Sequence, residues 1–299
     1  MAMEELRSLI ERNARTEITA VTERVHISRI DHTGPPQFSS TGSQLVMLAQ
    51  GAKQLALGAQ THVYRPGEAL IAPLDLPMTG LFIEASRELP SLGFSMALQP
   101  ALIADLLLDP TASRLPSFGS NATPPPGVIV FSVSSELIDA VTRLVGLAER
   151  PLDLPVLAPL IEREIHWLLL RGPQSEVIRQ LGIADSGLTR VGRAVRWLRE
   201  HYTETVRVEE LARMSAMSTS AFHRGFQEVT ALSPIQFQKQ LRLQEARVRL
   251  LADGKDVAGI AHDVGYESAS QFSRDYRARF GAPPLEDVRR LREVAPAGV

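Results

Sequence analysis

Two stretches in the C-terminal third of this 299-residue chain are copies of each other. The segment VEELA at 208–212 returns as VAGIA at 257–261, and FHRGF at 222–226 returns as FSRDY at 272–276. The spacing is 49 residues for the first pair (208 to 257) and 50 for the second (222 to 272), so the second copy holds one extra residue in its turn. A fixed period of this size indicates one supersecondary unit used twice.

Each copy predicts a short helix, a tight turn and a second helix. The first copy gives helices over 206–213 and 219–229, and the second gives a recognition helix over 268–279. Ser218 is a good N-cap for the second helix of copy one, and Ser233 with Pro234 begins a long linking helix that runs to about residue 252. A helix-turn-helix unit places its second helix in the major groove of DNA, so two copies predict two recognition helices.

Small and aromatic residues mark the inside of each unit. Ala212 and Ala261 let the first helix approach the second, and Gly265 suits a tight turn, with Ala216 as its weaker counterpart. Four aromatic residues recur at i and i+4 and predict core anchors. They are Phe222, Phe226, Phe272 and Tyr276.

The outward positions of the two recognition helices predict the residues that contact DNA. Arginine can bind guanine with two hydrogen bonds, glutamine can do the same with adenine, and serine or threonine reaches bases or phosphates. These positions are Thr219, Ser220, His223, Arg224 and Gln227 in copy one, and Ser268, Ala269, Ser270, Gln271, Arg274 and Arg277 in copy two. The alternative is a solvated helix face, and Arg224 and Arg274 can also contact phosphate or pair with an internal acid.

The charge balance differs between the two parts of the chain. Residues 190–299 carry 18 Lys and Arg against 14 Asp and Glu, a balance of +4, and residues 1–189 carry 14 against 20, a balance of −6. A basic part joined to an acidic part suits a phosphate-binding module with a separate partner domain.

The front part predicts a small antiparallel barrel or sandwich followed by helices. A short helix is expected over 4–14, and short apolar strands separated by turns follow at 18–21, 25–27, 44–48, 54–57, 69–72, 80–84 and 94–97. Helices over 135–149 and 155–170 form a hairpin that packs on the barrel, with one face either against a second subunit or used only within the chain. We expect a sensor domain over 1–172 with this hairpin at about 134–171, a linker over 173–188 with a short helix around 176–181, and a DNA-binding domain over 189–299.

Composition excludes several classes of function. The chain has no cysteine, which excludes disulfides, thiolate nucleophiles and cysteine metal sites. It has no apolar run long enough for a membrane span, so no membrane partner and a cytoplasmic location are expected. Histidines His26, His32 and His62, with Glu68, are scattered and form no ligand pair, so no metal, cofactor or catalytic residue is predicted.

A small barrel without catalytic motifs can bind an apolar or mixed ligand in its mouth. We expect an effector of unknown identity there. The candidate ligand contacts are Phe38, Met47, Tyr64, Arg65, Met78 and Phe82, each of which can also be a core residue.

The repeated segments resemble the AraC/XylS family of bacterial transcription regulators. The resemblance covers roughly residues 190–292 and rests on LARMS at 211–215, FHRGF at 222–226, and FGAPP at 280–284. The segment YRPGE at 64–68 also resembles the cupin-like sensor half of many such regulators. The resemblance implies an α+β chain, in which a cupin-like β-barrel with accessory helices precedes an all-α domain of two helix-turn-helix subdomains joined by a long helix.

The resemblance also implies which positions read bases. They fall on Ser220, His223 and Arg224 in the first unit, and on Ala269, Ser270, Gln271, Ser273 and Arg274 in the second. The chain departs from the family pattern at Phe237, where tyrosine is usual, and at Asp287 and Val288, where the family ends in Tyr-Arg.

Together these observations predict a sequence-specific transcription regulator that binds double-stranded promoter DNA and responds to a small molecule. It is expected to form a homodimer, to contact RNA polymerase if it activates transcription, and to act in the bacterial cytoplasm at the nucleoid. Two alternatives stay open: a cupin-type enzyme fused to a DNA-binding domain, and a DNA-binding protein whose barrel is only an interaction module.

Overall fold

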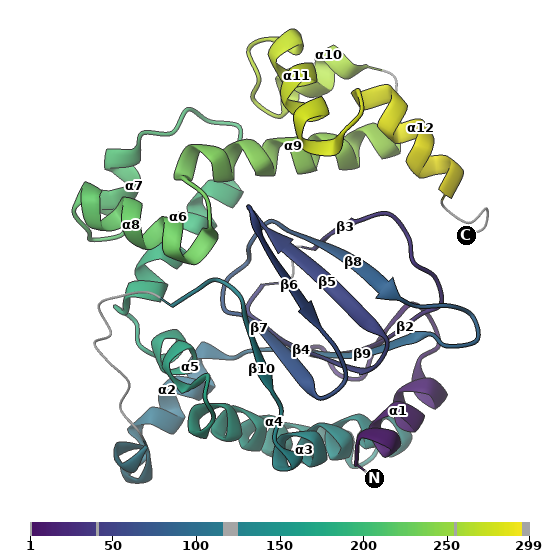
Figure 1. Cartoon of the computed structure of the whole chain (residues 1–299). Helices are drawn as coiled ribbons and strands as arrows, with labels where there is room; N and C mark the ends of the chain where they lie inside the picture. The colour runs from purple at the N-terminus through teal and green to yellow at the C-terminus, as the bar shows by residue number, and fades with distance from the viewer. Residues whose placement is uncertain (1, 40–41, 116–124, 254–255, 295–299) are drawn as a thin grey trace. The chain divides into compact units, whose positions relative to one another are not determined.

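The chain folds into two compact units, one of strands and helices and one of helices alone (Figure 1). In the computed structural model, residues 2–39, 42–115, 125–253 and 256–294 are described. The first unit comprises residues 1–192 with 228–231, and the second comprises residues 193–227 with 232–299.

Ten strands form two antiparallel sheets in the described part of the first unit. The six-stranded sheet has the order β1-β2-β9-β4-β7-β10, and the four-stranded sheet has the order β3-β8-β5-β6. The strands are β1 (Ile18–Ala20), β2 (Val25–Ile30), β3 (Gln37–Ser39), β4 (Gln44–Gln50), β5 (Ala52–Leu57), β6 (Gln60–Tyr64), β7 (Glu68–Ala72), β8 (Met78–Glu84), β9 (Ser91–Ala97) and β10 (Ile129–Ser132).

The two sheets face each other and enclose a cavity between them. Central strands are buried on both faces: in β4, Leu45 and Met47 face away from the four-stranded sheet, while Val46 and Leu48 face it. The strand pairings give two separate sheets that face each other. The closed cupin-like barrel implied by the resemblance stays a prediction.

Helices cover the outer side of the six-stranded sheet. Helix α1 (Ala2–Asn13) packs on β2, β4 and β9 through Leu6, Leu9 and Ile10, and on α3 (Ser135–Gly146). Helix α3 in turn packs on α4 (Leu154–Arg171). Burial of the apolar stripe of each amphipathic helix explains why these segments are helical where they lie. The predicted helical hairpin is therefore present, with a short 3-10 turn at Leu147–Glu149 between its helices.

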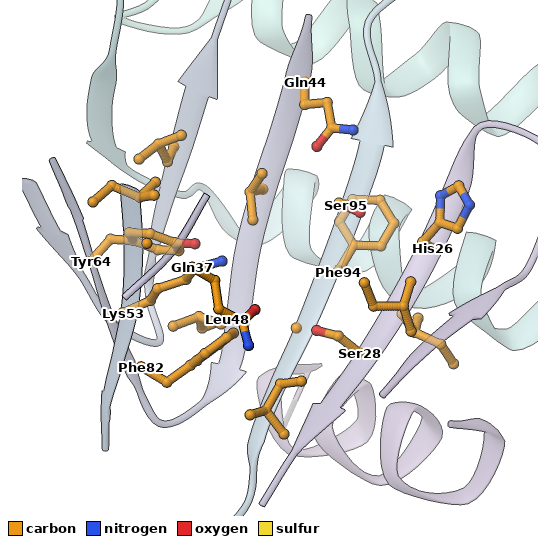
Figure 2. A pocket seen from close by; sticks show the side chains of 18 of the residues that line it. His26, Ser28, Gln37, Gln44, Leu48, Lys53, Tyr64, Phe82, Phe94 and Ser95 are labelled. Carbon is orange, nitrogen blue, oxygen red and sulfur yellow. The ribbon is translucent and has the colours of Figure 1, made fainter. Parts of the chain in front are cut away.

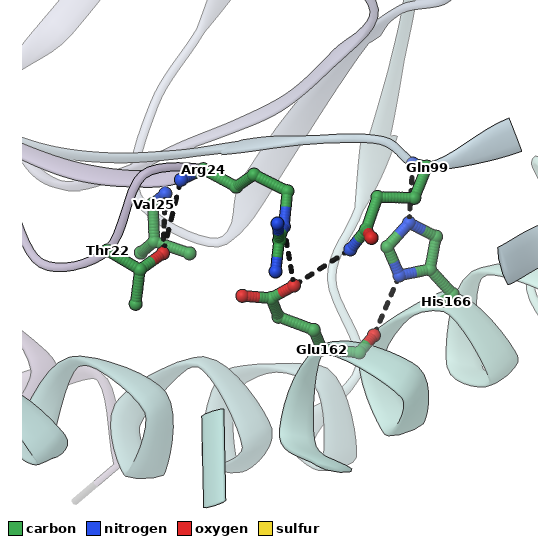
Figure 3. Close-up of polar contacts among 6 residues, drawn as sticks. All are labelled: Thr22, Arg24, Val25, Gln99, Glu162 and His166. Carbon is green, nitrogen blue, oxygen red and sulfur yellow. Dashed lines mark hydrogen bonds and ion pairs between the residues drawn. The ribbon is translucent and has the colours of Figure 1, made fainter. Parts of the chain in front are cut away.

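A buried polar cluster joins α4 to the end of β9 (Figure 3). The Glu162 carboxylate, which is fully buried, accepts from Arg24 Nε at 3.0 Å and from Gln99 Nε2 at 2.7 Å. His166 Nε2 accepts from the Gln99 backbone N–H at 3.0 Å, and its Nδ1 lies 2.7 Å from the Glu162 carbonyl oxygen. Burial lowers the pKa of His166, although its hydrogen bond to the Glu162 carbonyl opposes this, so the ring is neutral with the proton on Nδ1.

The segment expected to be a linker contains the short helix that the sequence predicts there. Residues 173–188 contain α5 (Ser175–Gly182), whose Val177, Ile178 and Leu181 are buried. Helix α5 packs on α2 (Pro100–Leu108) and on α4. Its apolar face is too large to be left in water, which is why the unit boundary falls after Gly192, in the middle of α6 (Gly187–Glu200).

The second unit contains the repeat in the expected order. Its helices after α6 are α7 (Val208–Met214), α8 (Thr219–Thr230), α9 (Pro234–Asp253), α10 (Val257–Asp263), α11 (Ala269–Phe280) and α12 (Pro284–Val294). Ser233 and Gln236 cap α9 reciprocally, each side chain accepting from the other residue's backbone N–H at 3.3 and 3.0 Å. Helix α12 does not follow from the sequence pattern, because Gly281, Pro283 and Pro284 indicate only the end of α11. Pro284 instead occupies the first turn of a new helix.

Candidate functional site

The two helix-turn-helix copies share one backbone hydrogen bond in their turns, and the extra residue of the second copy, Glu267, follows that bond. The Met217 N–H donates to the Ala212 carbonyl at 3.0 Å in the first copy, and the Tyr266 N–H donates to the Ala261 carbonyl at 2.9 Å in the second. The residue before each donor has a left-handed backbone, with φ of 50° at Ala216 and 92° at Gly265. This matched turn fixes the angle at which each recognition helix leaves its partner.

Aromatic side chains hold the recognition helices against the unit's interior. Phe222, Phe226, Phe272 and Tyr276 are fully buried, as the sequence predicted. The Phe222 and Phe226 rings are 5.4 Å apart, and the corresponding Phe272 and Tyr276 rings are 5.5 Å apart. Since these rings face inward at i and i+4, positions such as Arg224 and Arg274 between them face outward.

An arginine on the linking helix ties the second turn to the end of α6. Arg242 Nε donates to the Tyr202 carbonyl at 2.6 Å, and its Nη1 donates to the Gly265 carbonyl at 2.7 Å. Its Nη2 donates to the carbonyls of Thr203 and Glu204 at 3.1 and 2.9 Å. Burial lowers the pKa of Arg242, and the nearby Tyr266 and Glu267 oppose that effect. Arg242 thus positions the second helix-turn-helix rather than being available to a partner.

The residues expected to contact DNA share the outer faces of α8 and α11. All are exposed except Ser273, which is half-buried: Thr219, Ser220, His223, Arg224 and Gln227 on the first helix, and Ser268, Ala269, Ser270, Gln271, Ser273, Arg274 and Arg277 in the second copy. Ser218 and Ser268 cap the two helices by accepting from the N–H of Ala221 at 3.3 Å and of Gln271 at 3.4 Å. Ser268 is thus a cap residue as well as an exposed one.

The exposed arginines of this surface have no acidic partner among the described residues. Arg224 and Arg277 have no hydrogen bond or ion pair from their side chains to any described residue. Arg274 Nη2 donates to Gln271 Oε1 at 2.8 Å, one turn earlier on the same helix. This hydrogen bond holds the Arg274 and Gln271 side chains together on the outer face of α11, and both residue types can bond bases. No carboxylate among the described residues pairs with the positive charge of Arg274.

The first unit holds a cavity of about 330 Å³ between its two sheets (Figure 2). Its wall is largely apolar, with Val46, Leu48 and Phe94 from the six-stranded sheet and Leu55 and Met78 from the four-stranded one. Polar side chains at the wall include His26, Ser28, Gln37, Gln44 and Ser95. The volume is at the lower end of the range for small-molecule sites.

The predicted ligand contacts divide into two groups. Tyr64, Met78 and Phe82 line the cavity. Met47 and Arg65 do not line it. Met47 points to the opposite face of β4 and is fully buried there, because side chains alternate along a strand. Arg65 lies in the turn after β6 and pairs with Glu84 at 2.8 Å. The side chain of Phe38 lies outside the described residues.

Sequence reasoning missed Lys53, the lysine of the cavity wall. Its Nζ lies 4.5 Å from the centre of the Phe82 ring, and burial lowers its pKa to about 8. The strand was predicted to begin at Gln54, which placed Lys53 in a turn, but β5 begins at Ala52. Lys53 is paired with Tyr64 on β6 and with Phe82 on β8, so the three side chains share one face of the sheet. This arrangement follows from the strand pairing and cannot be read from the local sequence.

The four residues weighed as metal ligands are dispersed in the first unit. His32 pairs with Asp31, Glu68 accepts from the Arg65 N–H at 3.0 Å, and His26 lines the cavity. Burial lowers the pKa of His62. Within the described ranges, no group of three or more His, Asp or Glu side chains is placed to hold a metal ion. The helices of these ranges include none that is both long and apolar enough to cross a membrane.

Comparison with known families identifies the two units. Residues 21–177, more than half of the chain, match the family described as AraC-type transcriptional regulator N-terminus. The chain belongs to the AraC family. Residues 211–290 of this AraC-family chain match a helix-turn-helix domain family, which covers both copies of the repeat.

Curated relatives of the AraC-family chain are bacterial transcriptional activators. The HTH-type transcriptional activator RhaS of Salmonella arizonae is 29% identical over 167 residues, 55% of this chain and 58% of that protein. The virulence regulon transcriptional activator VirF of Yersinia enterocolitica is 28% identical over 178 residues, 60% of this chain and 64% of that protein. The matches thus span less than two thirds of these relatives.

Solved structures of ToxT from Vibrio cholerae share the fold of the AraC-family chain. One superposes with a TM-score of 0.54 at 9% identity and covers 89% of this chain and 97% of that chain. A second, of ToxT bound to (E)-4-(8-methylnaphthalen-1-yl)but-3-enoic acid, gives a TM-score of 0.54 at 11% identity and covers 90% and 98%. At these identities the likeness concerns the fold: a sheet domain followed by a helical domain with helix-turn-helix units.

Proposed function

We propose that this chain is a transcription regulator that binds double-stranded promoter DNA through α8 and α11. The proposal rests on the repeated helix-turn-helix. In each copy, exposed arginine, glutamine and serine side chains lie on the outer face of the second helix. Arg224 and Arg277 have no described partner, and Arg274 is paired only with Gln271. We propose that these arginines and Gln271 supply the sequence-specific contacts and that the neighbouring hydroxyls contact phosphates.

The cavity between the sheets supports an effector-binding role for the first unit. It is closed on both sides by strands, mostly apolar, and lined by a few polar groups, as small-molecule sites are. The proposal treats the effector as a ligand that binds two states of the protein with different affinities, since only such a difference can change DNA binding. Contact with RNA polymerase, and action in the bacterial cytoplasm at the nucleoid, belong to the same proposal and follow from the activator relatives.

An exposed apolar row on α4 supports the proposed homodimer. Val156 and Leu160 are 66% and 61% exposed and lie four residues apart on α4, so they share one helix face, and Leu152, 92% exposed, lies in the turn just before the helix. The α4 face opposite packs within the unit through Ile161 and Ile165. A row of this kind, left outside the core, suits a second copy of the same helix.

The decisive experiment selects bound sequences from a random DNA pool at stated salt, followed by affinity measurements on the enriched site. Arg274→Ala is expected to weaken specific binding by about 1–3 kcal/mol, the scale of one bidentate base contact. Arg87→Ala, on an exposed loop of the first unit, removes the same charge far along the chain from the repeat and serves as control. Equal affinity of Arg274→Ala and the control, with both folded, would contradict the proposed surface.

The enzyme alternative has no specific observation in its favour. The curated relatives reported above are activators, and we propose that the chain likewise has no catalytic activity of its own. Stoichiometric metal in purified protein, by elemental analysis, would revive the enzyme hypothesis.

A further inference from the structure

Three residues form a row across the inner face of the four-stranded sheet. Lys53 on β5 is paired in register with Tyr64 on β6 and with Phe82 on β8, so the three side chains are direct cross-strand neighbours. All three line the cavity, and Figure 2 shows them projecting from these strands toward the strands that carry Gln44, Phe94 and His26. Neighbours in register on one face lie close enough to bind a single group.

Tyr64 has an unmet hydrogen-bonding group inside this row. Its side chain is fully buried, and its hydroxyl has no hydrogen-bond partner among the described residues. A buried hydroxyl without a partner is costly, and native structures keep few of them. Since the hydroxyl belongs to a residue that lines the cavity, a ligand in the cavity can supply the missing partner.

Lys53, which is half-buried, brings a charge to the same row. No carboxylate or other hydrogen-bond acceptor among the described residues accepts from its Nζ; the contact recorded is with the Phe82 ring. The acid of the cavity wall, Glu17, is exposed at the end of β1 and does not pair with it. A desolvated ammonium with no counter-ion is retained against its cost when a ligand completes the pair.

Gly80 makes room for this arrangement. A Cβ atom at Gly80 would lie 2.9 Å from Lys53 Cε and 3.2 Å from a Leu55 methyl group. The absence of a side chain at this position of β8 therefore lets the lysine stem run across the neighbouring strand. The stem of Lys53 therefore occupies space that a side chain at position 80 would fill.

We infer that the cavity takes a small organic acid, whose carboxylate is bound by the Lys53 ammonium and the Tyr64 hydroxyl while its apolar body contacts Phe82 and the opposite sheet. One cation and one hydroxyl on adjacent strands match a singly charged carboxylate. The inference rests on the proposed effector-binding function and specifies its ligand class.

The inference can be tested on the full-length protein by calorimetric titration with paired probes. Octanoate is compared with octanamide, and benzoate with benzamide, because each pair keeps the body and removes the charge. We expect each acid to bind at least about 10-fold more tightly than its amide, the scale of one charge-assisted hydrogen bond. Equal binding of acid and amide, or binding of neither, overturns the inference.

Substitutions assign the preference to the row. Lys53→Met should abolish the preference for the acid, and Tyr64→Phe should weaken acid binding while leaving amide binding unchanged. Gln54→Met, on the same strand but the other face, is the control and should change neither. Because Lys53→Met removes an uncompensated buried charge, the ligand-free variant should melt at the same or a higher temperature than the wild type. A lysine that merely supports the fold would give the opposite shift, and retention of the acid preference in Lys53→Met contradicts the inference.

Failure of this inference can be distinguished from failure of the proposed function. If acids bind through Lys53 but leave DNA affinity unchanged, the inference stands and the effector role fails. If the selected DNA site binds tightly and responds to amides as well as to acids, the regulator stands and the carboxylate assignment fails.

Discussion

The left-handed residues of the two helix-turn-helix copies occur as matched pairs. Ala216 and Gly265 occupy the turns inside the two copies, and Ala231 and Gly281 follow their recognition helices, with φ of 50°, 92°, 57° and 79° in that order. The first copy therefore uses alanine where the second uses glycine. A left-handed backbone costs a non-glycine residue about 1–2 kcal/mol, so the first copy holds strain that the second does not.

The two glycines are expected to respond differently to substitution by alanine. Gly281→Ala should lower the free energy of unfolding by about 1–2 kcal/mol, since a Cβ there meets nothing within 4 Å and only the φ of 79° opposes it. Gly265→Ala should cost clearly more, because its Cβ would lie 2.6 Å from the Thr203 carbonyl oxygen. Denaturant titration of the full chain measures both, with Ala216→Gly, expected to be neutral or mildly stabilising, as the control. A Gly265→Ala loss no larger than that of Gly281→Ala contradicts the tight approach.

At the scale of elements, α12 is anchored by a single buried carboxylate. Asp287 accepts from Arg247 Nε at 2.7 Å and Nη2 at 2.9 Å on α9, and from the Tyr276 hydroxyl at 3.0 Å on α11. Arg247 also lies over the Phe280 ring at 4.5 Å. The departure from the family pattern at Asp287 therefore has a structural role, which joins three helices around the second recognition helix.

Asp287→Asn is expected to destabilise the protein by about 3–5 kcal/mol, because it removes the carboxylate charge that faces the buried Arg247 guanidinium. Burial alone would raise the pKa of Asp287, but hydrogen bonds from Arg247 and Arg290 outweigh it and lower the pKa below 3.8. The wild-type advantage should thus be complete above about pH 4 and be lost as pH falls through the lower folded-state pKa. Urea unfolding of the wild type and of Asp287→Asn at a series of pH values measures this difference in stability.

Arg290→Ala is the control, because it removes an exposed partner of the same carboxylate and should cost at most about 1 kcal/mol. Similar losses of stability in Asp287→Asn and Arg290→Ala would refute the burial argument.

The exposed row on α4 gives a prediction about association. Leu160→Glu should shift the protein from dimer to monomer in sedimentation equilibrium, because it places a charge in the proposed helix-to-helix contact. Leu108→Glu, on α2, is equally a change of an exposed leucine, which is 84% exposed, and should leave the dimer intact. A wild-type protein that is monomeric at every concentration, or a Leu160→Glu protein that stays dimeric, would show that α4 is not the interface.

Elements with a clear apolar period were predictable from the sequence, and those formed by pairing were not. The helices of the repeat and strands such as β4 and β7 follow from local patterns, as do the buried Phe222 and Phe272. Strand β6 (Gln60–Tyr64) was missed because it is an edge strand with exposed polar residues and no apolar alternation. Lys53 was missed for a related reason: its role depends on Tyr64 and Phe82, which lie on other strands and share no sequence period with it.

At the scale of the whole molecule, the length of α9 sets the spacing of the two recognition helices on DNA. Helix α9 has 20 residues and links the two helix-turn-helix copies directly. At 1.5 Å per residue it spans roughly 30 Å, close to the ~34 Å of one turn of B-form DNA. Two recognition helices held this far apart can enter successive major grooves on the same side of the duplex.

This geometry predicts how affinity depends on the spacing within the selected DNA site. Inserting 5 base pairs between the two blocks of the enriched motif turns the second block by about half a helical turn, so one recognition helix should lose its contacts. Affinity should then fall to that of a site with one block scrambled, and Arg274→Ala or Arg224→Ala, whichever reads the displaced block, should have no further effect. Electrophoretic mobility shifts at fixed salt measure all of these. If affinity is unchanged by the insertion, the two copies do not read DNA as one rigid pair, and the linking helix would have to bend or only one copy would bind.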